Sequence, residues 1–161
     1  MILARTRDMD LVGRIVSHPA IWPHITDDTT PTFEPIPDND AIHWMLVDDG
    51  APAGLFMVHA HNLVCYEMHT CLLPRTWGQQ AAAAAQMLLK WAFEETDCQK
   101  MITAVPAYNR PALRFAKAGG MVQEGINRAS IMRNGVLTDQ IMLGITKQEW
   151  TTCQQSPSSA Q

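Results

Sequence analysis

Glu67 and His69 are the residues whose types and spacing most directly suggest catalysis. They lie two positions apart in an extended, largely apolar segment, so on a β-strand their side chains project from the same face. A carboxylate or an imidazole held in this way can take a proton from a nucleophile as a general base. The alternative is that this face is merely the solvated side of the strand. The opposite face suits a core by alternation and carries Tyr66, Met68, Thr70 and Leu72.

A metal site is the less favoured interpretation of the nearby histidines. His59 and His61 form an i, i+2 pair on the preceding predicted strand and could join His69. Protein zinc sites combine histidine, cysteine and carboxylate ligands at recognisable spacings, and no carboxylate or cysteine completes such a set here. We therefore expect no bound metal, and ordinary hydrogen-bonding roles for these histidines.

The elements that must position these residues follow a mixed α/β order. Apolar alternation predicts strands at residues 1–7, 42–48, 55–61, 63–73, 100–105, 121–132 and 136–146. Helical spacing predicts one helix that begins at Asp8 and others at residues 79–93 and 111–117. The proline-rich residues 18–40 predict a long loop with at most a short helical turn. Asn134-Gly135 predicts a type I′ hairpin between the last two strands.

Composition limits the classes to which the protein can belong. The 161 residues suit one domain, expected at residues 1–148, with a mobile polar tail at 149–161. A formal net charge of −4 without clustered Lys and Arg argues against nucleic-acid binding. No segment approaches the roughly 18 consecutive apolar residues of a membrane span, so we expect no membrane partner and a cytoplasmic protein. The four scattered cysteines are expected to be reduced and mostly buried.

Two segments, "LLPRTWGQQAAAAAQMLLKWAF" and "NRPALRFAKAGGMVQEG", together with the order of elements, resemble the GNAT N-acetyltransferase family over residues 1–148. The second segment is the more specific, because it is similar to the family's Asn-x-x-Ala-x-x-Phe-x-x-x-x-Gly pattern. The stretches "HPAIWPHITDD" and "YEMHTCLLP" are similar to a branch encoded by tailed phages, some members of which carry a head-assembly label. The resemblance implies a single GNAT-like α/β domain. Its mixed central sheet would have six to seven strands, with the fourth and fifth splayed into a wedge and helices at the flanks.

The resemblance also implies that acetyl-CoA lies in this wedge, and that an amine attacks the thioester directly in a ternary complex. The N-terminus of the helix after the turn would present unpaired N–H groups to the pyrophosphate. The backbone N–H of Leu72 or Leu73 would polarise the thioester carbonyl if the strand bulges there. The residues implied in cofactor binding are Leu72, Leu73, Trp77, Gly78, Gln79, Gln80, Ala81, Ala82, Asn109, Ala112 and Phe115.

The phosphate-binding turn departs from the family's pattern, which is Gln/Arg-x-x-Gly-x-Gly/Ala. Alignment by the helix start places Trp77, Gln80 and Ala82 at the three marked positions, and only Ala82 conforms. A frame shifted by two residues places Arg75, Gly78 and Gln80 there instead. In either frame a glutamine side chain lies close to the pyrophosphate, to which it could itself donate a hydrogen bond.

The general acid of the family is also replaced. Ala116 occupies the position of the usual tyrosine, and a methyl group cannot protonate a leaving thiolate. Tyr108 is the nearest phenol in sequence and becomes the candidate acid, with Glu67 and His69 as candidate bases for the amine. Over the acceptor side of the wedge, the resemblance places a loop with Trp22, His24, Asp27 and Asp28. Its carboxylates could hold a cationic amine, or Asp27-Asp28 could simply begin a solvated turn.

The sequence therefore favours acetyl transfer from acetyl-CoA to an amine of a small molecule or a protein. The partners would be that amine and, in a homodimer, a second copy of the chain. The alternative is a catalytically degenerate GNAT-like assembly or structural protein of a phage particle. Its partners would be phage structural proteins, and it would remain in the virion. The missing glycines of the turn and Ala116 favour the alternative, whereas Asn109 and the Glu67/His69 pair favour the enzyme.

Overall fold

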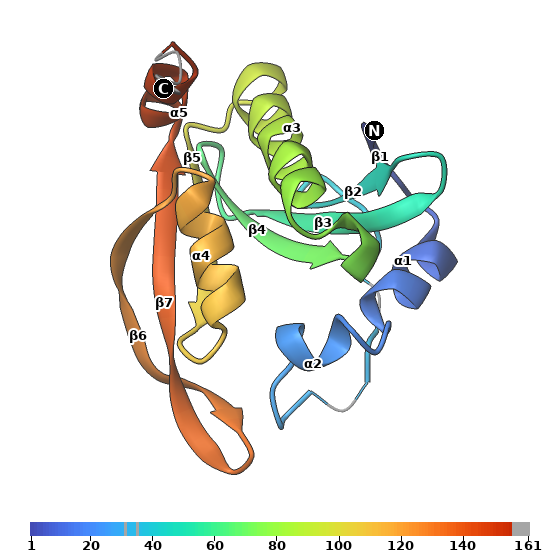
Figure 1. Cartoon of the computed structure of the whole chain (residues 1–161), viewed down its shortest axis with the longest axis vertical. Coiled ribbons are helices and arrows are strands. Elements are labelled where there is room, and N and C mark those ends of the chain that lie inside the picture. The colour runs from blue at the N-terminus through green and yellow to red at the C-terminus, as the bar shows by residue number, and fades with distance from the viewer. Residues whose placement is uncertain (31, 35, 156–161) are drawn as a thin grey trace.

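The computed structural model describes residues 1–30, 32–34 and 36–155, which form a seven-stranded mixed sheet with helices packed against it (Figure 1). The strands are β1 (Ile2–Arg5), β2 (Ile42–Asp48), β3 (Pro52–Ala60), β4 (Cys65–Leu72), β5 (Lys100–Pro106), β6 (Val122–Arg133) and β7 (Val136–Thr146). The helices are α1 (Met9–Val16), α2 (Trp22–Ile25), the 3₁₀ turn η1 (Pro74–Thr76), α3 (Gln79–Glu95), α4 (Arg110–Ala118) and α5 (Lys147–Gln155). The expected GNAT-like α/β architecture is confirmed.

The strand order is β1-β2-β3-β4-β5-β7-β6, and every neighbouring pair is antiparallel except β4 and β5. Short turns suffice for the antiparallel meander from β2 to β4. A parallel neighbour needs a crossover connection, which η1 and the 17-residue helix α3 provide between β4 and β5. The predicted hairpin at Asn134-Gly135 joins β6 to β7, and both of these residues have positive φ angles (53° and 72°).

Alternation along the strands produces one apolar cluster on each face of the sheet. On one face, residues of β2, β3 and β4 pack with the buried stripe of α3, including Met45, Phe56, Val58 and Met68. On the other face, the intervening residues pack with α1, including Ile42, Trp44, Leu55 and Cys71. In β4, Tyr66, Met68 and Leu72 face α3 as expected, so Glu67 and His69 project to the α1 side.

The two parallel strands separate after three pairs. Their register runs from Cys65↔Lys100 to Glu67↔Ile102 and then stops. Beyond that point β4 stays paired with β3 as far as Leu72, and β5 stays paired with β7 as far as Pro106. A wedge therefore opens between β4 and β5, as the resemblance implied.

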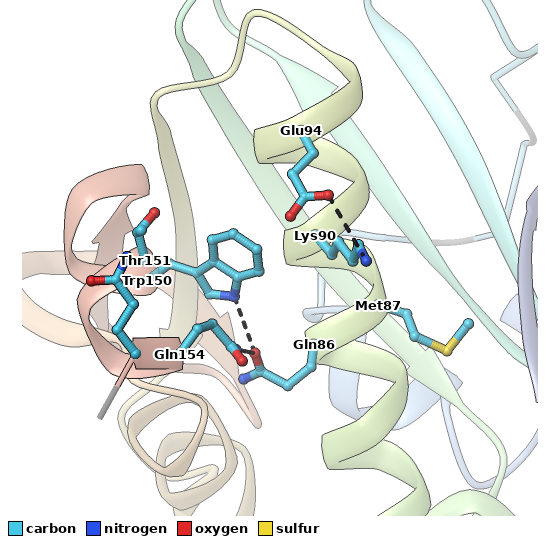
Figure 2. A pocket seen from close by; sticks show the side chains of 8 residues that line it. Gln86, Met87, Lys90, Glu94, Trp150, Thr151 and Gln154 are labelled. Atoms are coloured by element: carbon cyan, nitrogen blue, oxygen red, sulfur yellow. Dashed lines mark hydrogen bonds and ion pairs between the residues drawn. The ribbon is translucent and has the colours of Figure 1, made fainter. Parts of the chain in front are cut away.

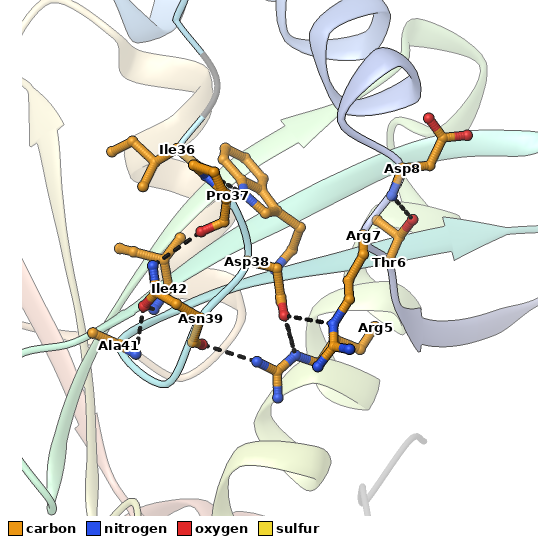
Figure 3. Close-up of polar contacts among 11 residues, drawn as sticks. Arg5, Thr6, Arg7, Asp8, Ile36, Pro37, Asp38, Asn39, Ala41 and Ile42 are labelled. Carbon is orange, nitrogen blue, oxygen red and sulfur yellow. Dashed lines mark hydrogen bonds and ion pairs between the residues drawn. The ribbon is translucent and has the colours of Figure 1, made fainter.

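The long loop before β2 is held by a buried carboxylate that the sequence did not single out (Figure 3). Asp38, with 1% of its side chain exposed, accepts hydrogen bonds from Arg5 Nε at 2.7 and 3.0 Å and from Arg7 Nε at 3.3 Å. Burial alone would raise the pKa of Asp38, but the hydrogen bonds from the two arginines outweigh it and lower this pKa below 3.8. The short helical turn expected in this loop is α2.

The expected mobile tail from residue 149 is wrong for residues 149–155, which belong to α5. Trp150 is 8% exposed, its ring lies 5.6 Å from that of Phe93, and its Nε1 donates to Gln86 Oε1 at 3.1 Å. One buried indole thus docks a polar helix on α3. The remaining expected tail residues, 156–161, lie outside the described part of the chain.

The sequence predicts cysteines that are reduced and mostly buried. All four cysteines are free; Cys71 and Cys98 are buried, Cys65 is half-buried and Cys153 is exposed. Burial raises the pKa of Cys71 to about 12 and that of Cys98 to about 11, so both thiols stay protonated.

Within residues 1–30, 32–34 and 36–155, none of the helices is long and apolar enough to cross a membrane.

Candidate functional site at the wedge between β4 and β5

Glu67 lies at the apex of the wedge. It is the last residue of β4 that pairs with β5, opposite Ile102. Only 16% of its side chain is exposed, so this face of β4 is not simply solvated, which was the alternative considered from the sequence. A carboxylate held at the point where two strands separate can act on a group that enters between them.

His69 lies two residues further along β4 on the same face. Its Nε2 is 3.7 Å from Glu67 Oε1, so the structure brings the two candidate bases together. Although 40% of its side chain is exposed, burial against the sheet lowers the pKa of His69 below 6.5. The nearby His59 and His61 also lower the pKa of His69, whereas the negative charge of Glu67 raises it. A neutral imidazole beside the carboxylate can accept a proton or orient a water molecule.

The expectation that no carboxylate completes a metal-ligand set is wrong. The carboxylate that seemed to be missing is Glu67, which lies directly opposite His59 in the β3–β4 register. His61 Nε2 and Glu67 Oε2 are 2.7 Å apart. One ligand atom from each of His59, His61 and Glu67 lies within 4.8 Å of the other two.

The end of β4 offers one of the two predicted backbone donors. The N–H of Leu73 donates to Ala53 O at 3.0 Å, so the expectation for Leu73 as a free donor is wrong. Antiparallel pairing alternates, and the N–H of Leu72 therefore points away from β3, into the wedge. No bulge interrupts β4, because its register with β3 is continuous from Tyr66 to Leu72.

Gly54 explains how β3 and β4 approach each other at this point. It pairs with Leu72 and has a φ of +140°. A Cβ at Gly54 would lie 2.6 Å from Leu72 Cα and 2.7 Å from Cys71 O. Only glycine fits here without displacing the backbone that carries the Leu72 N–H.

The N-terminus of α3 has the features of an anion-binding cradle. Its cap is Gly78, with φ +84° and no side chain to satisfy the first turn. The N–H groups of Gln79, Gln80 and Ala81 have no partner at i−4 within the helix. The side chains of Gln79, Gln80 and Ala82 are exposed, whereas Ala81 packs into the core with 5% exposure. These residues fit a pyrophosphate group, with the two glutamines at its rim.

The two possible frames of this turn are distinguished by Arg75. Its guanidinium donates to Asp49 Oδ1 at 2.7 Å and to the carbonyl oxygens of Ala51 and Pro52. Arg75 thus ties η1 to the β2–β3 turn and is not directed to the cradle. Trp77 is 57% exposed, and its Nε1 donates to Leu72 O at 3.0 Å.

The motif residues of α4 have mainly structural contacts. Asn109 caps the helix by accepting a hydrogen bond from the Ala112 N–H at 3.3 Å. Ala112 and Phe115 are half-buried against the core, and Ala116 is 8% exposed. Contact of Asn109, Ala112 and Phe115 with a cofactor stays a prediction.

Tyr108 and His24 line one cavity of about 440 Å³, which brings the candidate acid next to the predicted acceptor loop. The other lining residues are Asn109, Pro111, Arg133, Asn134 and Thr138. The Arg133 guanidinium lies 5.8 Å from the centroid of the Tyr108 ring, which is 38% exposed. No local sequence pattern predicts Arg133 as a site residue. It reaches this cavity because it lies at the end of β6, in the long β6–β7 hairpin.

The carboxylates of the acceptor loop are engaged within the protein. Asp27 Oδ1 accepts hydrogen bonds from the Thr29 N–H and hydroxyl and from the Thr30 hydroxyl, and those from Thr29 chiefly lower the pKa of Asp27. Asp28 Oδ2 accepts from the Gly135 N–H at 2.7 Å. The alternative of a turn at Asp27-Asp28 is therefore supported, and Asp28 ties that turn to the β6–β7 hairpin.

Trp22, the remaining predicted residue of the acceptor loop, packs into the α1 side of the core. Its ring lies edge-on to that of Phe33, with centroids 6.3 Å apart. It therefore anchors the loop that carries His24.

A second cavity, of about 420 Å³, lies between α3 and α5 and includes Gln86, Lys90, Glu94 and Trp150 in its lining (Figure 2). None of the predicted site residues lines it. Lys90 pairs with Glu94, and Gln86 accepts hydrogen bonds from Trp150 and Gln154. These contacts dock α5, and the predicted catalytic residues lie outside this cavity.

Comparison with known proteins agrees with this geometry. Residues 12–120 match the Acetyltransferase (GNAT) family. The chain is 34% identical over 64 residues to the SPbeta prophage-derived uncharacterized N-acetyltransferase YokL of Bacillus subtilis; the match covers 40% of this chain and 36% of that relative's length.

Solved structures share the fold. One is a point mutant of the spermidine N-acetyltransferase SpeG from Vibrio cholerae, with TM-score 0.79 and 15% identity over 96% of this chain and 100% of that one. Another is the spermidine N-acetyltransferase from Vibrio cholerae in complex with CoA and spermine, with TM-score 0.77 and 17% identity over 93% and 97% of the two chains.

Proposed function

The chain belongs to the GNAT acetyltransferase family, and from that premise we propose that it transfers an acetyl group from acetyl-CoA to an amine by direct attack in a ternary complex. The observation that carries the proposal is the position of Glu67. Its carboxylate is largely buried at the last paired position before β4 and β5 separate. A base at the apex of the wedge can act on an amine whose nitrogen reaches the thioester from the α1 side.

Residues of β4 and α3 would hold acetyl-CoA. The N–H groups of Gln79, Gln80 and Ala81 would bind the pyrophosphate, and Gly78 allows the turn that exposes them. The N–H of Leu72 would donate to the thioester carbonyl oxygen and stabilise the negative charge that develops there. Asn109, Ala112 and Phe115 would flank the cofactor from α4.

Glu67, His69 and Tyr108 would carry out the two proton transfers of the reaction. The attacking nitrogen must lose a proton, and Glu67 accepts it directly or through a water molecule oriented by His69. The leaving CoA thiolate gains a proton from the Tyr108 hydroxyl or from water, because Ala116 cannot supply one. The acetyl group is transferred in one step, without an acyl-enzyme.

The acceptor in this proposal is an amine, of a small molecule or of a protein, that enters through the cavity lined by His24 and Tyr108. The volume of about 440 Å³ suits an extended amine or a single side chain. A polyamine is a reasonable first test compound, because the fold is shared with spermidine N-acetyltransferases. Trp22, Asp27 and Asp28 would shape this entrance through the contacts that fix their loop.

The experiment is a CoA-release assay with acetyl-CoA and a panel of polyamines, simple primary amines and peptides. We expect release that depends on one amine class, and a loss of about 10²- to 10⁴-fold in kcat for Glu67→Gln. Glu94→Gln is the matched control, since Glu94 is a half-exposed residue of α3 paired with Lys90. Equal rates for Glu67→Gln and the native chain would exclude Glu67 as the base.

The second candidate is a degenerate assembly protein of a phage particle with phage structural partners. The missing glycines of the turn, Ala116 and the prophage origin of YokL favour it. No contact within residues 1–30, 32–34 and 36–155 favours assembly over catalysis. Acetyl-CoA-dependent turnover would favour the enzyme, and a chain that fails to bind acetyl-CoA and stays in purified virions would favour assembly.

A further inference from the structure

Three side chains at the turn end of the β3–β4 hairpin converge although the proposed acetyl transfer requires only one of them. His59 lies opposite Glu67 across the two strands, and His61 follows two residues later. His61 Nε2 is 2.7 Å from Glu67 Oε2, and the two imidazole centroids are 4.7 Å apart. The ligand atoms of all three residues lie within 4.8 Å of one another.

The sheet fixes this arrangement. Register places the His59 and Glu67 side chains side by side on one face. His61 lies one residue beyond β3, and the hydrogen bond from its N–H to Cys65 O at 3.0 Å continues the pairing of the two strands. Glu67 is only 16% exposed and holds its carboxylate in place, whereas 40% of the His61 side chain is exposed. An ion could therefore enter from solvent on the imidazole side and meet a carboxylate that is already positioned.

The donor set selects the kind of ion. Two imidazole nitrogens and one carboxylate oxygen suit Zn²⁺ and similar transition-metal ions, whereas Mg²⁺ and Ca²⁺ prefer oxygen ligands alone. Around a tetrahedral ion with bonds of about 2.0–2.2 Å, ligand atoms lie about 3.3–3.6 Å apart. The observed separations, from 2.7 Å to at most 4.8 Å, bracket this value. Small side-chain rotations would complete the geometry.

We propose that His59, His61 and Glu67 form a binding site for one Zn²⁺-class divalent cation, with a fourth position left for water or for His69. The Nε2 of His69 lies 3.7 Å from the other oxygen of Glu67. An ion at this site occupies the carboxylate that is proposed to act as the base. The site itself does not depend on that role, and metal binding is measurable without acetyl transfer.

The test is titration of the EDTA-treated, desalted full chain with CoCl₂, followed by visible absorption of low-symmetry Co²⁺. We expect one Co²⁺ per chain, displaced by one Zn²⁺. His59→Ala and His61→Ala should each weaken binding by more than the roughly 10- to 100-fold that loss of an outer-shell partner causes. His24→Gln is the matched control, a histidine outside the cluster in the cavity near Tyr108, and should bind as the native chain does.

A second measurement, of the unfolding midpoint, distinguishes loss of metal binding from loss of folding in the variants. Zn²⁺ should raise the unfolding midpoint of the native chain and of His24→Gln, but not that of His59→Ala or His61→Ala, whose metal-free midpoints report whether they fold. Two results would overturn the site: no Co²⁺ absorption at millimolar metal, or binding that both cluster variants leave unchanged. The second result would mean that the ion binds at another place on the surface.

Discussion

Gly54→Ala should disturb both the fold and the site, because β3 and β4 touch at this residue. A methyl group would lie 2.6 Å from Leu72 Cα and 2.7 Å from Cys71 O, and backbone atoms cannot rotate away as a side chain can. An ordinary contact of about 3.5–4.0 Å requires that the strands separate by about 1 Å.

The cost has two parts. Overpacking of this kind costs about 1–3 kcal/mol, and a non-glycine residue held at the φ of +140° adds about 1–3 kcal/mol of strain. Because separation of the strands relieves part of this strain, the two costs do not add in full. The free energy of unfolding should therefore fall by about 2–5 kcal/mol. For a chain of this length the unfolding midpoint should then fall by about 4–20 °C.

The assay is thermal and denaturant unfolding beside Gly13→Ala as matched control. Gly13 lies in α1, and an added Cβ there meets nothing within 4 Å. That control should gain about 0.5–1 kcal/mol from its helix propensity. Displacement of the Leu72 N–H should also lower the kcat/KM of Gly54→Ala by up to about 100-fold. A Gly54→Ala chain as stable as the native protein would refute the close approach of β3 and β4.

Three other outcomes follow from the contacts described. Asp38→Asn should lower the free energy of unfolding by about 1–3 kcal/mol, because Arg5 and Arg7 lose a charged acceptor. Since the pKa of Asp38 is depressed below 3.8, its stabilisation is fully present above that pH and is lost as the pH falls further; the stability of Asp38→Asn, measured by urea unfolding, should lack this step. Tyr108→Phe should slow CoA release by about 10²-fold or more if its hydroxyl is the acid, and an unchanged rate would mean that water protonates the thiolate. Zn²⁺ should inhibit transfer by occupying Glu67, EDTA should restore it, and His61→Ala should need more Zn²⁺; inhibition that this variant leaves unaltered would place the metal effect elsewhere.

Patterns local in sequence predicted much of the fold. The strand-to-helix junction at Gly78 and the Asn109 segment located α3 and α4, and alternation in β4 separated the core residues from Glu67 and His69. These features succeed because each depends on neighbours within a few residues.

Long-range partners account for the errors. The role of Asp28 depends on Gly135, 107 residues away, and that of Asp38 on Arg5 of β1 and the adjacent Arg7. The proposed metal site depends on the register that sets His59 opposite Glu67, which spacing within one strand does not reveal. The polar composition after residue 149 predicted mobility, but Trp150 and Gln154 both contact α3 and hold α5 against it.

The central claim is that the wedge and the α3 N-terminus bind acetyl-CoA, and a thermal-shift titration tests it most directly. A ligand at 100 times its Kd adds about 2.7 kcal/mol of stability, which for a chain of this length raises the unfolding midpoint by about 5–11 °C. We expect a saturable rise of this size with acetyl-CoA. An unchanged midpoint at millimolar acetyl-CoA would contradict the claim.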